Sequence, residues 1–255
     1  MTTVGREEPA APVGSDWRHY THDRNLPEVL NSALDVFVRL GYHGTSVRAI
    51  AAKAGLSVPG LYHYYNSKQE IFASLLRLSN DEVMSRSRAA LASAGPGPRD
   101  RFVALVENIV LYMTHRRRLA RVAREIHFLE EPYRSRHVAL RDELESMVLA
   151  EVAAACAAGD FTADDPHEAT RAVLVLCQGV ADWYTPVGPK RPEEIARQYV
   201  DFALALVGNR TLPRSEGTSA TPVTLVPGLS GARGLLRRAG RPFQPAAGAP
   251  QGTVC

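Results

Sequence analysis

The chain has 255 residues, of which 45% are apolar and 22% are charged, and its formal net charge is +3; this is the composition of a globular protein with one large domain or two small ones. Its three cysteines have neither disulfide nor zinc spacing, and its first residues form no apolar leader, so we expect a cytoplasmic protein without a metal site or cofactor. No apolar run approaches the roughly 18 residues of a membrane-spanning helix.

The two ends of the chain differ in composition from its middle. Residues 1–22 are rich in Pro, Gly and Ala, and we expect a disordered arm there. Residues 209–255 are rich in Gly, Pro, Ser, Thr and Arg, so they cannot bury enough apolar surface to offset the entropy lost on ordering. This tail is predicted to be disordered, although its segment GLLRR is also compatible with a short binding element.

The region between the ends has apolar residues at helical spacing almost throughout, and no segment alternates as a β-strand would. The predicted fold is therefore all-α. Start signals support the boundaries: Ser67 and Glu70 form a capping box, and Asp165 precedes a first-turn proline. Nine helices are expected, near residues 27–40, 47–54, 57–65, 67–94, 99–115, 118–129, 133–158, 166–184 and 192–207.

The second and third predicted helices are short and are joined by the segment AGLS. A tight turn containing a glycine, here Gly55, between two short helices is the helix-turn-helix pattern. Ile50, Leu56 and Leu61 would form the small core beneath the pair. The second helix of such a unit enters the major groove of DNA with its first residues toward the base edges, so residues 23–70 are predicted to be a DNA-binding domain.

A row of aromatic residues follows the Pro-Gly pair of the third helix. Tyr62 and His63 are predicted to face base edges, where side chains donate hydrogen bonds or touch thymine methyl groups. Tyr65 is predicted to pack inward. For Tyr62 and Tyr64, the alternative to DNA contact is that they also cover the core. Hydroxyl groups at the helix starts, with Tyr64 and Lys68, are predicted to contact phosphates. The full set of predicted DNA contacts is Thr45, Ser46, Ser57, Val58, Pro59, Gly60, Tyr62, His63, Tyr64 and Lys68.

Local charge agrees with a nucleic-acid partner. Between Arg39 and Gln69 there are four basic residues and no Asp or Glu. Positive charge gathered on a compact segment is expected of a surface that binds DNA. A chance gap between acidic residues would give the same count, so charge alone does not decide the point.

The segment TSVRAIAAKAGLSVPGLYHYYNSKQEIF, preceded by VFVRLGYHG, resembles the DNA-binding domain of the TetR family of bacterial transcriptional regulators. The layout of the remaining chain, a long connecting helix followed by further helices, is similar to that family as well. The resemblance implies a homodimer whose last two helices form a four-helix interface, a ligand cavity in the C-terminal body, and repression that a ligand releases. Residues 71–208 are accordingly expected to bind the effector and to dimerise.

The candidate ligand contacts are polar and aromatic side chains within the apolar helices of the body. Pockets are mainly apolar with a few placed polar groups, and this set would suit one. Each residue also has a structural alternative: Trp183 would equally suit the core or a dimer interface, whereas Gln178 needs a polar partner in an apolar run. The predicted contacts are Asn108, Tyr112, Arg124, His127, Phe128, Gln178 and Trp183, with Tyr133, His137 and Tyr184 as further candidates.

Two segments of the body, RRRLARVAREIHFLEEPYR and GVADWYTPVGPKRPEEIARQYVDFAL, resemble members of the same family that are linked to lipid, steroid or acyl-CoA catabolism. This resemblance implies an acyl-CoA thioester or another apolar carboxylate as effector. The phosphates of coenzyme A would need basic residues near the cavity mouth. The candidates are Arg116, Arg117, Arg118, Arg121 and Arg124, for which a solvated helix face is the competing interpretation.

The eighth and ninth predicted helices carry apolar faces that are compatible with a dimer interface and equally with an internal core. The first face consists of Val173, Leu174, Leu176, Cys177 and Val180, and the second of Ile195, Tyr199, Phe202, Leu206 and Val207. A dimer also follows from the DNA-binding logic, because two helix-turn-helix units on a two-fold axis read a palindrome.

Two other function classes compete with a regulator. An enzyme is not expected, because the sequence has no Gly-rich phosphate loop, metal-ligand spacing or nucleophile elbow. A helical protein-interaction adaptor would suit the body and the arginine-rich tail, but it would leave the segment LSVPGLYHYYNSK unexplained.

Overall fold

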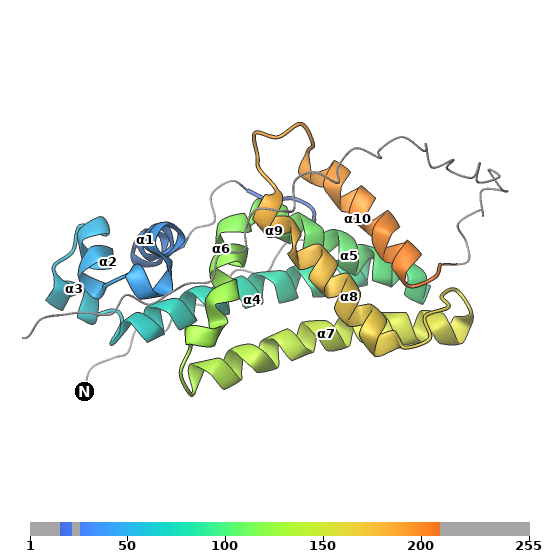
Figure 1. The fold of residues 1–255 in the computed structure, drawn as a ribbon, viewed down its shortest axis with the longest axis horizontal. Helices are drawn as coiled ribbons and strands as arrows, with labels where there is room; N and C mark the ends of the chain where they lie inside the picture. The colour runs from blue at the N-terminus through green and yellow to red at the C-terminus, as the bar shows by residue number, and fades with distance from the viewer. Residues whose placement is uncertain (1–15, 22–25, 210–255) are drawn as a thin grey trace, which may run out of the picture. The chain divides into compact units, whose positions relative to one another are not determined.

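The computed structural model describes residues 16–21 and 26–209, and this part of the chain contains helices but no β-strand (Figure 1). Its elements are α1 (Glu28–Gly44), α2 (Val47–Lys53), α3 (Val58–Tyr62), α4 (Lys68–Ser93), α5 (Pro98–His115), α6 (Arg117–Val122), the 3-10 helix η1 (Ala123–Phe128), α7 (Tyr133–Ala158), α8 (Pro166–Gln178), α9 (Val180–Trp183) and α10 (Pro192–Leu206). The all-α prediction is confirmed. The predicted tail, from residue 210 on, lies outside the described residues.

The predicted helices are all found, but two of them are broken. The sixth is divided into α6 and η1, where Glu125 departs from helical geometry with φ −82° and ψ 17°. The eighth is divided into α8 and α9 at Gly179. α1 changes direction at Gly41, whose φ of 68° lies in the left-handed region that favours glycine.

α1, α2 and α3 pack together at one end of the long helix α4 and form the head of the molecule (Figure 1). Large side chains buried in its core include Leu30, Phe37, Ile50 and Leu61, and Phe72 of α4 packs among them. Leu119 and Val122 of α6, together with Leu129, belong to the same apolar core. The head is therefore attached to the rest of the molecule by side-chain packing as well as by the continuous helix α4.

The remaining helices form the body, with α5 at its centre. α5 contacts α4, α7, α8 and α10, and Figure 1 shows it between α10 and α7. Its side chains Phe102, Leu105 and Ile109 are fully buried in the main apolar core. Burial of this stripe against the neighbouring helices stabilises the body, because apolar area removed from water drives helix packing.

Residues 16–21 pack against α4 and α5, which corrects the prediction of a disordered arm for this segment. Trp17 is buried, and its indole Nε1 donates a hydrogen bond to Ser93 Oγ at 2.8 Å. The ring of Tyr20 stacks on that of His115, with centroids 4.3 Å apart. Two large aromatic side chains bury enough apolar surface to offset the ordering of so short a segment. The first fifteen residues of the predicted arm lie outside the described part.

A cluster of three buried charged side chains lies beside this N-terminal segment. Glu82 of α4 accepts hydrogen bonds from Arg86 Nε at 3.2 Å and from Arg116 Nε at 3.0 Å, and each of the three side chains is less than one tenth exposed. Arg86 also donates to the backbone carbonyls of Trp17 and His19. The Glu82 cluster therefore links α4, the end of α5 and the N-terminal segment.

Candidate nucleic-acid interface and effector cavities

α2 and α3 meet at a tight turn in which Gly55 adopts a left-handed backbone, with φ 68°. Each helix is capped by the serine before it. Ser46 Oγ accepts a hydrogen bond from the N–H of Ala49 at 3.1 Å, and Ser57 Oγ accepts one from the N–H of Gly60 at 3.0 Å. Local sequence thus sets both helix starts, and the geometry is that of a helix-turn-helix unit.

The outer surface of α3 carries the predicted groove-facing residues. Tyr62 is 48% exposed and Tyr64 is 64% exposed, whereas Tyr65 is buried, as predicted. Ser46, Ser57, Pro59 and His63 are also exposed, and Val58 and Gly60 are half-buried. Tyr62 is the last residue of α3, and His63 and Tyr64 follow it directly. Phenol, imidazole and hydroxyl groups on and beside this short helix have the hydrogen-bonding capacity to meet base edges and phosphates.

Thr45 does not present its side chain to DNA, which corrects its prediction as a phosphate contact. It is only 3% exposed, and its hydroxyl donates to the carbonyl of Gly41 at 2.7 Å. Thr45 closes the C-terminal end of α1, while the exposed Ser46 takes the position that caps α2. The sequence TS offers two adjacent hydroxyl residues, and only the packing of α1 decides which one faces inward.

Lys68 has a structural role in addition to the predicted phosphate contact. Its ammonium group donates to the carbonyls of Tyr42 at 2.9 Å and Thr45 at 3.0 Å. It also lies 4.1 Å from the centroid of the Tyr42 ring. Desolvation at this half-buried position lowers the pKa of Lys68. The lysine thus fastens the start of α4 to the end of α1.

Replacing Lys68 with alanine is expected to lower the free energy of unfolding by about 1–3 kcal/mol, because two charge-assisted hydrogen bonds are lost. Urea unfolding followed by circular dichroism would measure the change. Lys53→Ala is the matched control, since Lys53 pairs with Asp35 at the surface and should cost less than about 1 kcal/mol. An unchanged urea midpoint for Lys68→Ala, with a salt slope of DNA binding reduced by about one, would make Lys68 a phosphate contact only.

The short helix η1 joins the head to the body. Glu125 Oε2 accepts a hydrogen bond from the N–H of Tyr42 at 2.6 Å, next to the bend at Gly41. Gln69 of α4 donates to the carbonyl of Phe128 at 2.8 Å, and the Phe128 ring stacks on Tyr42 with centroids 5.4 Å apart. Other residues of η1 line a cavity in the body, so this helix touches both regions.

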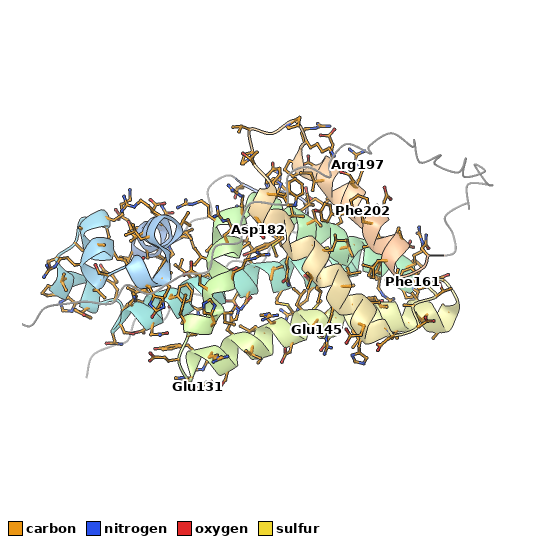
Figure 2. The ribbon with its side chains drawn as sticks, in the orientation of Figure 1. Glu131, Glu145, Phe161, Asp182, Arg197 and Phe202 are labelled. Atoms are coloured by element: carbon orange, nitrogen blue, oxygen red, sulfur yellow. The ribbon has the colours of Figure 1, made fainter. Side chains whose placement is uncertain are left out.

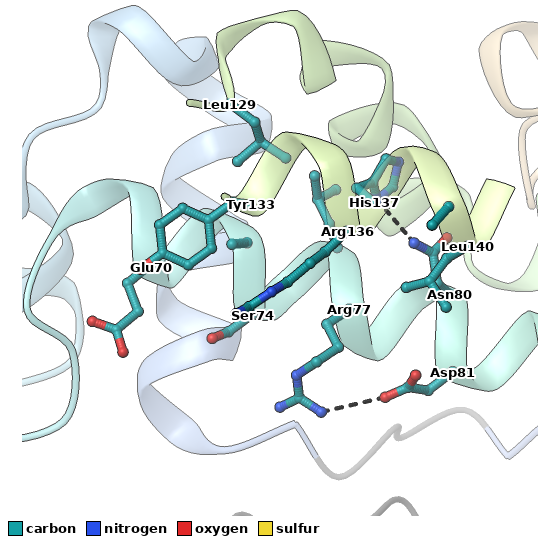
Figure 3. Close-up of a pocket in the computed structure, with 13 residues that line it drawn as sticks. Glu70, Ser74, Arg77, Asn80, Asp81, Leu129, Tyr133, Arg136, His137 and Leu140 are labelled. Carbon is teal, nitrogen blue, oxygen red and sulfur yellow. Dashed lines mark hydrogen bonds and ion pairs between the residues drawn. The ribbon is translucent and has the colours of Figure 1, made fainter. Parts of the chain in front are cut away.

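Two cavities lie among the helices of the body. The outer cavity, of about 590 Å³, lies between α4 and α7 beside the head (Figure 3). Its lining includes Leu76, Arg77, Asn80, Leu129, Tyr133, Arg136, His137 and Leu140. The inner cavity, of about 250 Å³, is formed by α4, α5, α6, η1, α7 and α8. Its lining includes Ser79, Asn80, Val83, Tyr112, Met113, Arg124, His137, Leu140, Arg141, Leu174 and Gln178.

The structure brings half of the predicted ligand residues to these cavities. Tyr112, Arg124 and Gln178 line the inner cavity, Tyr133 lines the outer one, and His137 lines both. The Tyr112 hydroxyl is 2.6 Å from Ser79 Oγ.

The other predicted ligand residues lie outside both cavities. Asn108 of α5 is fully buried and donates to Ser87 Oγ of α4 at 2.9 Å. His127 is exposed, and Phe128 packs on the head. Trp183 is 53% exposed and donates to the Tyr199 hydroxyl at 3.2 Å. The remaining candidate, Tyr184, is buried in the apolar core and lines neither cavity. The presence of an aromatic or polar residue in an apolar helix is thus not enough to predict that its side chain lines a cavity.

Sequence reasoning missed the polar residues that α4 contributes. Asn80 lies at helical spacing with the buried Leu76 and Val83, which is the same signal that drew attention to Gln178. Its amide Nδ2 is 2.8 Å from Nδ1 of His137. Burial, with the positive charge of Arg141, lowers the pKa of His137 to about 4, so its imidazole is neutral near pH 7.

Four of the five clustered arginines do not line a cavity. Arg116 is buried in the Glu82 cluster, Arg118 pairs with Asp35 on the head, and Arg117 donates to a backbone carbonyl of α9. Arg121 is exposed. Of the five arginines only Arg124 lines the inner cavity, and it also pairs with the exposed Asp182. The cluster is therefore not a single anion site, and its main part serves helix packing.

An apolar surface on α8, α9 and α10, which we call the α8–α10 face, is exposed to solvent. It consists of Val175 on α8, Trp183 on α9, and Phe202 and Leu206 on α10; Phe202 is labelled in Figure 2. Tyr199 continues it, with its ring centroid 5.7 Å from that of Phe202. In the face predicted on the eighth helix, Val173, Leu174, Cys177 and Val180 are buried in the protomer, which agrees with the alternative of an internal core.

No helix in the described part of the chain is long and apolar enough to cross a membrane. Within the same ranges no three His, Cys, Asp or Glu side chains are grouped so that they could hold a metal ion.

Comparison with known proteins adds sequence relatives. Residues 29–75 match the family model "Bacterial regulatory proteins, tetR family", and residues 95–207 match "Tetracyclin repressor-like, C-terminal domain". The chain is 31% identical over 132 residues to the transcriptional activator FasR of Mycolicibacterium smegmatis, covering 51% of this chain and 60% of FasR. It is 26% identical over 189 residues to the transcriptional repressor KstR2 of Rhodococcus jostii, covering 69% of this chain and 88% of KstR2.

Solved structures show the same architecture. PfmR of Thermus thermophilus, a TetR family transcriptional regulator, superposes with a TM-score of 0.65 at 30% identity, over 70% of this chain and 98% of PfmR. AibR, solved in complex with isovaleryl coenzyme A and operator DNA, has a TM-score of 0.63 at 21% identity, over 68% of this chain and 95% of AibR, and shares the fold. With both family models matched and PfmR covered almost completely, the chain belongs to the TetR family of bacterial transcriptional regulators.

Proposed function

We propose that this regulator is a repressor that binds a palindromic operator as a homodimer and leaves it when an acyl-CoA thioester or a related apolar carboxylate binds. The observation that carries the proposal is the exposed α3 surface on a head that is joined, through α4 and η1, to a body with two cavities. KstR2 is named a repressor, which supports repression, whereas FasR is named an activator. A reporter assay on the regulated promoter distinguishes repression from activation.

In the proposed complex α3 enters the major groove, with Tyr62 and His63 toward base edges and Ser57, Pro59 and Gly60 allowing close approach. Tyr64 and Ser46 lie at the edges of this surface, where phosphates would pass. The α8–α10 face would join two protomers, because an apolar patch of this kind on a soluble chain marks an interaction site. Two heads related by a two-fold axis would then read both half-sites.

The effector is assigned to the two cavities. Together they reach the range of roughly 300–1,000 Å³ that is usual for small-molecule sites, and their linings combine apolar side chains with a few polar groups. Arginines at both cavities would suit the phosphates of coenzyme A. AibR, which shares the fold, was solved with isovaleryl coenzyme A. η1 lines the inner cavity and holds the bend of α1, so it would transmit binding to the head.

The direct test is a gel-shift of the purified protein on its own upstream intergenic DNA, at two salt concentrations and with a panel of acyl-CoA thioesters. A specific shift that weakens with salt and is released by a thioester supports the whole proposal. A shift that no thioester disturbs retains the DNA-binding regulator and rejects the effector class. Absence of specific binding, also in a genome-wide selection, would favour an interaction adaptor instead.

Tyr62→Ala and His63→Ala should each weaken operator binding by roughly 5-fold to 150-fold, the effect of about 1–3 kcal/mol of lost base recognition. Binding to random DNA should change much less, because phosphate contacts provide most of it. Titrations on operator and random duplexes at the same salt measure both. His167→Ala, an exposed histidine at the start of α8, is the control. Equal losses on both duplexes would remove these residues from base recognition.

A further inference from the structure

The outer and inner cavities share a wall. Asn80 of α4 and His137 and Leu140 of α7 line both cavities, and they are the residues that the two linings have in common. Asn80 Nδ2 lies 2.8 Å from His137 Nδ1, so that this pair joins the two helices (Figure 3). His137 is almost completely buried. We call Asn80, His137 and Leu140 the partition.

The two cavities differ in size in a way that matters for an elongated ligand. The inner cavity, of about 250 Å³, falls below the range of roughly 300–1,000 Å³ that is usual for ligand sites, while the outer cavity, of about 590 Å³, lies within it. Beyond the partition, Val83, Met113 and Leu174 offer apolar surface. A ligand with a short apolar group fits the outer cavity alone, whereas a long chain needs the inner cavity as well.

The partition can be opened at low cost. It is held by one hydrogen bond between neutral groups, because His137 is uncharged near pH 7. Such a bond contributes less to stability than the burial of a few methylene groups of a ligand chain.

We propose that the two cavities form one bipartite effector site for a fatty acyl thioester, in which the partition discriminates acyl-chain length. Short acyl chains occupy the outer cavity and leave the Asn80–His137 pair intact. Long chains separate the pair and extend past Leu140 into the inner cavity. This inference rests on the effector class of the proposed function and adds the residues that set its specificity.

The test measures direct binding of butyryl-CoA and palmitoyl-CoA to the full chain by calorimetry, without DNA. Asn80→Ala opens the partition and should strengthen palmitoyl-CoA binding by about 3-fold to 10-fold, the value of one neutral hydrogen bond. Leu140→Phe narrows the passage and should weaken palmitoyl-CoA binding at least about tenfold, the effect of a buried steric conflict. Butyryl-CoA binding should change less than palmitoyl-CoA binding in both variants, because a short chain meets the partition only from the outer cavity. Circular dichroism verifies that each variant is folded.

Asp81→Ala is the matched control, because Asp81 follows Asn80 on α4 and lines the outer cavity only. It should affect both thioesters alike. If wild-type protein binds both thioesters but the two partition variants change both affinities equally, the partition does not select chain length and the inference is wrong while the effector class stands. If wild-type protein binds neither thioester, the effector class is wrong and the bipartite site for it is rejected too.

Discussion

Replacing Glu82 with alanine should lower the free energy of unfolding by about 3–5 kcal/mol, because it leaves two buried guanidinium groups without an acid. Glu82 accepts from Arg86 at 3.2 Å and from Arg116 at 3.0 Å, in a site where each side chain is less than one tenth exposed. The backbone carbonyls of the N-terminal segment would satisfy part of the lost bonding but none of the charge. Urea unfolding followed by circular dichroism measures the loss.

Two variants make this result specific. Glu82→Gln keeps an acceptor oxygen and should be less destabilising than alanine. Glu143→Ala removes the acid of the exposed pair between Arg88 and Glu143 and should cost less than about 1 kcal/mol, since solvent screens such pairs. A loss for Glu82→Ala as small as that of Glu143→Ala would show that the Glu82 cluster contributes little to stability.

If the proposed homodimer forms through the α8–α10 face, Phe202→Asp should weaken it by roughly 30-fold to 1,000-fold, which corresponds to about 2–4 kcal/mol for a buried interface residue. Phe202 is 49% exposed on the isolated protomer and lies beside Tyr199 on the α8–α10 face. A carboxylate there would have to be buried without a partner when two copies meet. Analytical ultracentrifugation measures the dimer, and a gel-shift should show a parallel loss of operator affinity, because one head alone binds weakly.

Val138→Asp is the control for this prediction. Val138 lies on α7, outside the α8–α10 face, and is 40% exposed, so the same substitution there should leave the dimer intact. A Phe202→Asp protein that sedimented as the wild type would place the dimer contact on another surface.

The helix-turn-helix unit was predictable because its determinants are local in sequence. Ser57 caps a helix whose third residue, Gly60, donates to it, and Gly55 takes the left-handed position of the turn. Each of these features depends on residues only a few positions apart. Either Thr45 or Ser46 could have capped α2. The packing of α1 turns Thr45 inward and leaves Ser46 as the cap, and this outcome could not be read from the sequence alone.

The cavities could be predicted only in part, because they depend on contacts between distant segments. Asn80 and His137 are 57 residues apart, and nothing near either residue indicates the other. In α8, Val173 is buried and Val175 is 70% exposed, although the two side chains are identical. Apolar residues lie on both sides of that helix, some in the core and some on the outer face. Hydrophobic spacing alone could therefore not tell the core residues from the exposed ones.

The packing of residues 16–21 also limits how far the head can travel. The head continues into α4 on one side, and on the other side only residues 22–25 separate its first described residue from the segment fixed by Trp17 and Tyr20. A chain extends by at most about 3.6 Å per residue, so this short connection limits the distance between the head and the N-terminal segment. A small tilt of the head about its junction with the body would leave this segment in place, whereas a wide movement of the head would require the Trp17 indole to leave its buried position beside Ser93.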